Sequence, residues 1–114
     1  MTTQISIDNI QPSALPFLGG GPKIANIQVA NSTYVPNGSS NISTSGGYAI
    51  INGYNFQSNV NVVLGNTLAT SVAYVSSVRL NIQVPALATG NYIVYVTNTD
   101  NGKVAVKPNG IIIV

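Results

Sequence analysis

The chain has 114 residues, of which 45% are hydrophobic and only 5% are charged. This length suits a single domain with its own core, and the absence of cysteine excludes disulfides and thiolate chemistry. The net charge of +2 comes from scattered residues rather than from a cluster. We therefore expect neither a nucleic acid nor a membrane surface as a partner.

The first 22 residues differ in composition from the rest of the chain. Isolated apolar residues stand among polar ones, and Pro12, Pro16 and the run Gly19–Pro22 follow them. Prolines and glycines disfavour regular structure, so residues 1–22 are predicted to form an extended arm with one short strand over Ile5–Ile10. The alternative is a disordered leader.

Strand addition to a neighbouring molecule uses a short apolar segment of this kind, because side chains fill pockets while the backbone pairs with a sheet edge. We expect the arm to bind its partner in this way. The candidate binding residues are Ile5, Ile7, Ile10, Leu15, Phe17 and Leu18.

From residue 23 onward the apolar residues follow the period of two that is typical of strands, and no helical period occurs. This pattern predicts about seven strands, with a long polar loop over residues 31–45, a hairpin turn at Asp100–Gly102 and a kink at Asn109–Gly110. The predicted strands cover residues 23–29, 47–52, 60–64, 71–75, 78–85, 92–97, 103–106 and 111–114.

The alternation also assigns side chains to the core. Residues 78–85 are the clearest case, because Val78, Leu80, Ile82 and Val84 share one face of the predicted strand. The expected core consists of Ile27, Ile51, Phe56, Val62, Leu64, Leu80, Ile82, Val84, Tyr92, Val94 and Val96.

Two groups of motifs resemble the two halves of an IPT/TIG domain. The first group is Ser45-Gly46-Gly47, Ile51-Asn52-Gly53-Tyr54-Asn55-Phe56 and Val62-Val63-Leu64-Gly65-Asn66. The second is Leu80-Asn81-Ile82-Gln83-Val84-Pro85, Gly90-Asn91-Tyr92 and Val94-Tyr95-Val96-Thr97-Asn98. The resemblance implies an all-β, immunoglobulin-like antiparallel sandwich over residues 23–114. The chain departs from the family pattern in its longer loop after the first strand and in its N-terminal arm.

Physical chemistry suggests a structural role for several of the motif residues. Gly53 is expected to bend the chain so that Phe56 turns back into the core. Gly65 and Asn66 suit a turn with positive φ. Tyr92 is expected to act as the corner tyrosine of an immunoglobulin-like sandwich.

The sequence offers no catalytic group, metal site or cofactor site. It has no histidine and no glutamate, and its two carboxylates are Asp8 in the arm and Asp100 in a predicted turn. We therefore expect no enzyme activity, no metal and no cofactor. The tyrosines at strand positions are interpreted as core edges and sheet faces rather than as a sugar-stacking platform: Tyr34, Tyr48, Tyr54, Tyr74, Tyr92 and Tyr95.

IPT/TIG resemblance implies a binding or assembly module, and two classes of function compete. The N-terminus lacks a signal-peptide pattern while the composition is rich in uncharged polar residues. This combination favours a virion protein made in the host cytoplasm, specifically a capsid decoration or cement protein of a tailed phage. Its arm would hold it on the major capsid protein or another virion protein, and we expect a homo-oligomer, for example a trimer around a local three-fold position, although the sequence fixes no number of copies.

Three other interpretations compete with the capsid hypothesis. A tail or fibre accessory protein fits the same arm and sandwich. A carbohydrate-binding adhesion module of a bacterial cell surface would have a surface glycan as its partner. A dimerisation module of the Rel kind is disfavoured, because the chain has no basic patch.

Overall fold

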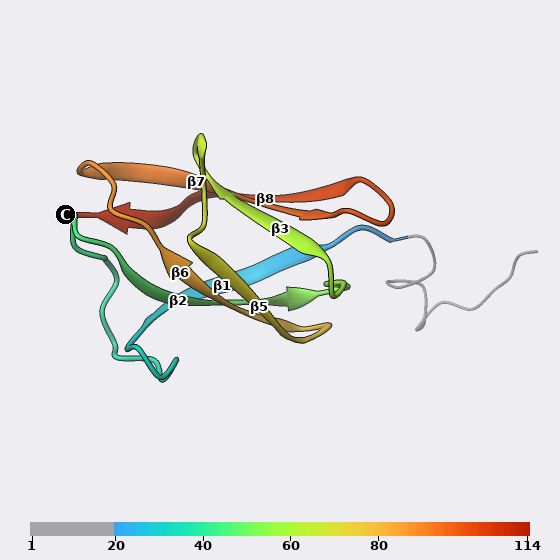
Figure 1. Cartoon of the computed structure of the whole chain (residues 1–114), viewed down its shortest axis with the longest axis horizontal. Helices are drawn as coiled ribbons and strands as arrows, with labels where there is room; N and C mark the ends of the chain where they lie inside the picture. The colour runs from blue at the N-terminus through green and yellow to red at the C-terminus, as the bar shows by residue number, and fades with distance from the viewer. Residues whose placement is uncertain (1–19) are drawn as a thin grey trace, which may run out of the picture.

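The computed structural model describes residues 20–114, which form two antiparallel sheets packed face to face (Figure 1). Sheet A has the order β1 (Lys23–Ala30), β2 (Gly47–Tyr54), β6 (Arg79–Val84) and β5 (Ser71–Ser76). Sheet B has the order β4 (Thr67–Leu68), β3 (Val60–Leu64), β7 (Gly90–Asn98) and β8 (Lys103–Ile113). The predicted all-β immunoglobulin-like sandwich is confirmed. Over residues 20–114 no helix is long and apolar enough to cross a membrane.

The observed strands agree with the predicted ones to within a few residues, with three differences. The two-residue strand β4 was not predicted. The two predicted segments at the C-terminus form one strand, β8, which continues through a register shift opposite Tyr92–Val94. Val78 was predicted to face the core but is 49% exposed, because it lies in the turn between β5 and β6.

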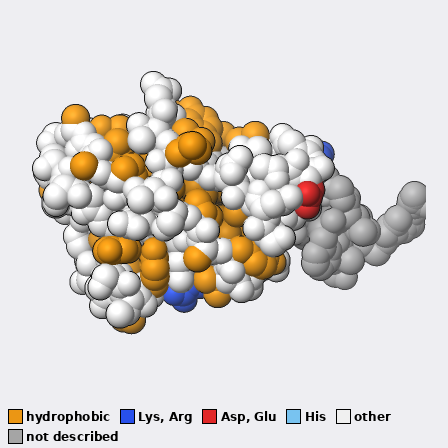
Figure 2. All heavy atoms as spheres, in the orientation of Figure 1, with side chains coloured by type: hydrophobic (Ala, Val, Ile, Leu, Met, Phe, Trp, Pro, Cys, Tyr) orange, Lys and Arg blue, Asp and Glu red, His pale blue; other side chains and the backbone are white. Residues whose placement is uncertain are grey.

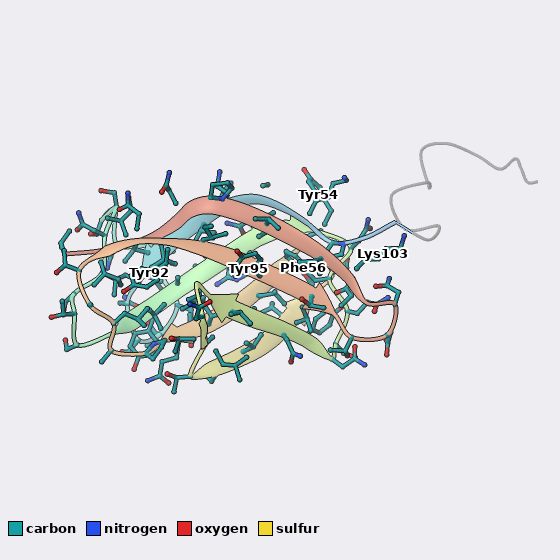
Figure 3. All side chains as sticks on the ribbon, turned by 90° about the horizontal axis from the view of Figure 1, so that it is seen from above. Tyr54, Phe56, Tyr92, Tyr95 and Lys103 are labelled. Carbon is teal, nitrogen blue, oxygen red and sulfur yellow. The ribbon has the colours of Figure 1, made fainter. Side chains whose placement is uncertain are left out.

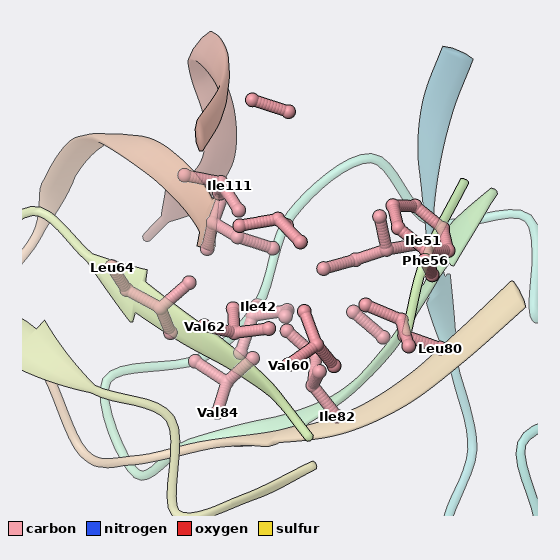
Figure 4. Close-up of a cluster of buried hydrophobic side chains, with 14 of the residues drawn as sticks. Ile42, Ile51, Phe56, Val60, Val62, Leu64, Leu80, Ile82, Val84 and Ile111 are labelled. Carbon is pink, nitrogen blue, oxygen red and sulfur yellow. The ribbon is translucent and has the colours of Figure 1, made fainter. Parts of the chain in front are cut away.

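Apolar side chains from both sheets fill the space between them (Figure 4). All expected core residues are buried except Ile27 and Tyr92, which are partly buried and pack against the core. Six further members of the buried core were not predicted: Ile42, Ala49, Val60, Ala105, Ile111 and Ile113.

Ile42 corrects the expectation that residues 31–45 are only a polar loop. Its side chain is 4% exposed, and its backbone forms a parallel bridge with Ile113 at the end of β8. Its amide donates to the carbonyl of Ile112 at 2.8 Å, and its carbonyl accepts from Val114 at 2.9 Å. The loop therefore returns once to the sandwich and continues the edge of sheet B for one residue.

The structure gives a physical reason for glycine at two positions, 65 and 53. Gly65 takes a φ of 66° in the β3–β4 turn, as expected, whereas Asn66 has no positive φ. A Cβ atom on Gly53 would lie 1.9 Å from the carbonyl oxygen of Lys23. Gly53 is therefore needed for the close approach of β1 to β2, not for a bend, although Phe56 does enter the core.

The N-terminal segment of residues 1–19 lies outside the described residues. The predicted division of the chain at residue 22 consequently stays a prediction. The same holds for the candidate binding residues of the arm: Ile5, Ile7, Ile10, Leu15, Phe17 and Leu18.

Candidate functional site

An open groove of about 450 Å³ lies between β1 and β8, the edge strands on one side of the sandwich. Part of the loop between β1 and β2 forms a third wall, which includes Pro36, Ser39 and Ser40. Small-molecule sites commonly have volumes of about 300–1,000 Å³, so this groove is large enough for a small ligand. We call it the β1–β8 groove.

The lining of the β1–β8 groove is mainly neutral. Apolar side chains of β1 and β8, such as Ile27 and Ile111, form its floor between the sheets. Among the residues described, Lys107 is the only charged one in the lining. The polar side chains of the lining are Asn26, Gln28, Ser39, Ser40, Lys107 and Asn109.

Asn52 on β2 orients two of the amides in this lining. Its Nδ2 donates to Oδ1 of Asn26 and to Oε1 of Gln28, both at 2.9 Å. The antiparallel register, which places Asn26 directly opposite Asn52, brings the three side chains to the same outer face of sheet A. These two hydrogen bonds fix the orientation of the Asn26 and Gln28 amides, whose NH₂ groups can then act as donors.

The loop wall is held in place by its own hydrogen bonds and by sheet A. Oδ1 of Asn31 accepts from the amides of Thr33 at 2.9 Å and Val35 at 3.1 Å. The guanidinium of Arg79 donates to the carbonyl of Tyr34 at 3.1 Å. The rings of Tyr34 and Tyr48 meet edge to face, with centroids 5.5 Å apart. The wall is therefore largely preformed, and Arg79 serves to anchor it.

Figure 3 shows Tyr54, Tyr92 and Tyr95 at separate places on the sandwich. Tyr92 donates from its hydroxyl to the carbonyl of Ala88 at 2.7 Å, which confirms the expected corner tyrosine. Tyr54 and Tyr74 are 54% and 41% exposed and lie on different strands of sheet A, while Tyr95 lies on sheet B. Within residues 20–114 the tyrosines do not form one stacking platform.

Charged side chains, both basic and acidic, are sparse on the surface. Figure 2 shows a face dominated by uncharged atoms, with few blue or red side chains. Asp100 lies in the predicted hairpin turn and accepts a hydrogen bond from Nδ2 of Asn59. In the described part of the chain no three acidic, histidine or cysteine side chains come together as a metal site. Among residues 20–114, the lining of the β1–β8 groove offers directional hydrogen bonds and one ammonium group and includes no carboxylate.

The groove residues were not singled out from the sequence. Asn26 and Gln28 alternate with Ile27 and Val29, and this pattern signals only a strand with one polar face. Lys107 and Asn109 are distant in sequence and reach the groove because β8 lies beside β1. The polar alternation in an edge strand was the only local signal.

The sequence model of the IPT/TIG domain family matches residues 32–109, which is more than half of the chain. The chain belongs to the IPT/TIG family. The match includes the loop wall and most of β8, and it begins after β1. The matched region of this IPT/TIG domain thus includes the loop wall of the groove with Lys107 and Asn109, whereas the β1 side precedes it and the lining residues 110–112 follow it.

Among solved structures, this IPT/TIG domain is similar to SGBP-B from a complex xyloglucan utilization locus in Bacteroides uniformis. The two are 20% identical with a TM-score of 0.58, and the alignment covers 81% of this chain and 23% of that chain. The likeness shows a shared fold, and the IPT/TIG domain spans 23% of the length of the similar chain. No curated protein sequence matches the chain.

Proposed function

We propose that this IPT/TIG domain is a non-catalytic carbohydrate-binding module of a bacterial surface protein, with the sugar held in the β1–β8 groove. The observation that carries the proposal is the pair of amides on β1, Asn26 and Gln28, which line the groove and are both held by hydrogen bonds from Asn52. Sugar hydroxyls are recognised by hydrogen-bonding groups held in fixed directions above an apolar floor. Asn26 and Gln28 supply two such donors, and the side chains of Ile27 and Ile111 form the apolar floor.

The remaining lining groups suit the same ligand class. Ser40 carries a hydroxyl that can donate and accept, and Asn109 carries an amide that can do both. The ammonium of Lys107 can donate to a ring or hydroxyl oxygen. This inventory matches the alternating donors and acceptors of a saccharide better than it matches a purely apolar ligand.

The similar solved structure supports this proposal more than it supports a virion protein, because its name places it in a xyloglucan utilization locus. We therefore take a neutral plant-type polysaccharide as the first ligand to test and the bacterial cell surface as the proposed location. The capsid decoration hypothesis rested on composition and on the arm. Its major capsid protein partner, its trimer and its virion location stay predictions.

Isothermal titration calorimetry with xyloglucan oligosaccharides tests the proposal directly. The double variant Asn26→Ala with Gln28→Ala should weaken binding about tenfold or more, because each lost hydrogen bond contributes roughly 0.5–1.5 kcal/mol. Asn61→Ala is the matched control, since this exposed asparagine lies on β3, outside the groove lining. It should leave binding unchanged.

A broader glycan array covers neutral, acidic and bacterial polysaccharides. Binding by the unmodified chain to none of them would overturn the carbohydrate proposal. Binding that survives in full in the double variant would overturn the assignment to the β1–β8 groove.

A further inference from the structure

The outer face of sheet B carries a row of apolar side chains across all four strands. Direct cross-strand pairing places Leu68 opposite Val63, Val63 opposite Tyr95, and Tyr95 opposite Val106. Side chains at directly paired positions lie on one face and touch. The row therefore runs from β4 at one edge of the sheet to β8 at the other.

Further apolar side chains widen this row. Val104 and Ile93 lie two residues from Val106 and Tyr95 respectively on the same strands, so they share the outer face. Leu68 is 63% exposed, and Val104 and Val106 are 50% and 52% exposed. We call the six residues the sheet B patch: Val63, Leu68, Ile93, Tyr95, Val104 and Val106.

The sheet B patch contrasts with the outer face of sheet A. The corresponding row on sheet A runs through Asn26, Asn52 and Arg79, which are polar or charged. None of the six patch residues is charged, and their immediate neighbours on the face include Asn61 and Thr97. An apolar cluster with an uncharged polar rim is typical of a protein–protein interface.

The open edges of both sheets are poorly suited to association. β8 carries Lys103, Lys107 and Pro108, and β4 has only two residues. The edge strands of sheet A both contain register shifts, in β1 at Ile24/Asn26 and in β5 at Tyr74/Ser76. Lysine, proline, short strands and bulges hinder edge-to-edge pairing. Among the surfaces of residues 20–114 compared above, the face of sheet B is therefore the one best suited to contact between two sandwiches.

The charge and size of the face favour a second copy as its occupant. Two identical uncharged faces meet without electrostatic cost, and the net charge of +2 per chain gives little repulsion. Four strands about 4.8 Å apart and a nine-residue β7 outline a face on the order of 500 Å². Standard interfaces bury about 800 Å² per partner, so the face suits a weak, reversible dimer.

We propose that a second copy of this chain packs on the sheet B patch, forming a two-fold symmetric dimer of sandwiches. Each copy contributes the same residues to such an interface. Tyr95 lies on β7, an inner strand of sheet B, and is therefore placed near the centre of the contact. The β1–β8 grooves lie at the strand edges and stay open, so the dimer would present two of them.

Sedimentation equilibrium of the full chain tests the dimer. We expect a concentration-dependent dimer with a Kd between about 10 µM and 1 mM. Val106→Lys should weaken it at least tenfold, because it would bury an unpaired charge. Val75→Lys is the control, since Val75 is equally exposed, at 51%, but lies on β5 of sheet A. A chain that stays monomeric at 1 mM, or a dimer equally sensitive to both variants, would overturn the proposal.

A covalent readout traps a weak dimer and avoids any effect of lysine on folding. The chain has no cysteine, so Thr97→Cys introduces a single thiol next to the patch, on the outer face of β7. We expect oxidation to give a disulfide-linked dimer at concentrations where Ala73→Cys, on exposed β5, gives much less. Equal crosslinking of the two variants would overturn the assignment to sheet B.

Discussion

Asn98 is completely buried and donates from Nδ2 to the backbone carbonyl of Asn55, 2.7 Å away. Its Oδ1 accepts from the amide of Gln57 at 3.1 Å. Asn98 ends β7 in sheet B, whereas Asn55 and Gln57 follow β2 of sheet A. One side chain therefore ties the two sheets together at the end where Phe56 enters the core.

Replacing Asn98 with alanine should destabilise the domain by roughly 2–4 kcal/mol, because it removes both part-buried hydrogen bonds between the sheets and leaves a cavity where the side chain was. Urea denaturation followed by circular dichroism measures the change. Asn91→Ala is the control, since Asn91 is exposed on the same strand, and we expect a change within about 0.5 kcal/mol. Similar values for the two variants would show that the bridge contributes little.

Gly53→Ala should be at least as damaging, although it adds one methyl group. The new Cβ would lie 1.9 Å from the Lys23 carbonyl oxygen and 2.7 Å from Cζ of Phe56. Since backbone must move, we expect a loss of about 3 kcal/mol in the free energy of unfolding. The control variant is Gly102→Asn. No atom lies within 4 Å of the position of its new Cβ, and asparagine tolerates the positive φ that Gly102 has. That variant should stay within about 1 kcal/mol of the unmodified chain.

Tyr92→Phe removes only the hydroxyl that donates to Ala88. The aromatic ring keeps its packing against the core, so we expect a loss of about 1 kcal/mol, typical of one hydrogen bond. Thermal unfolding measures the melting temperatures of Tyr92→Phe and of the control variant Tyr54→Phe. Tyr54 is a suitable control because its side chain is 54% exposed. An equal melting temperature for both variants would contradict the corner role.

Asn52→Asp separates sugar binding from folding. A carboxylate at position 52 would accept from the NH₂ groups of Asn26 and Gln28 instead of donating to their oxygens. Both amides would then turn over and present carbonyl oxygens at the groove. We expect at least tenfold weaker binding of xyloglucan oligosaccharides with stability preserved within about 1 kcal/mol.

Two outcomes of the Asn52→Asp experiment would contradict this prediction. Unchanged affinity in calorimetry, with the fold intact, would mean that the orientation of Asn26 and Gln28 does not matter for the ligand. A parallel loss of stability and binding would assign Asn52 to folding alone.

The period of two in the apolar residues predicted the sandwich and nearly all of its strands, because alternation reports directly which face of a strand is buried. Leu80, Ile82 and Val84 are buried as this pattern requires. Val78 extends the same pattern but faces solvent, since a turn interrupts the strand before it. Local pattern does not show where a turn begins when the flanking residue is also apolar.

Ile42 and Ile50 show where the sequence was insufficient. Ile42 stands among polar residues, and its burial depends on pairing with the distant Ile113. Ile50 lies on the outer face of sheet A, yet it is 1% exposed, and the neighbouring loop is held against that face by Arg79. Both outcomes depend on contacts between segments far apart in sequence.

Composition, alternation and turn residues by themselves determined that this chain is a charge-poor, all-β domain, because these signals are local, and the IPT/TIG type was implied by the resemblance of its motifs to that family. Only the tertiary structure decided which polar side chains share a groove and which apolar ones share an exposed face. Asn26 meets Lys107 in the groove lining because two edge strands lie side by side, and Leu68 reaches the row of Val106 through the register of four strands. Strand order and register arise from the packing of the whole chain, so no short stretch of sequence encodes them.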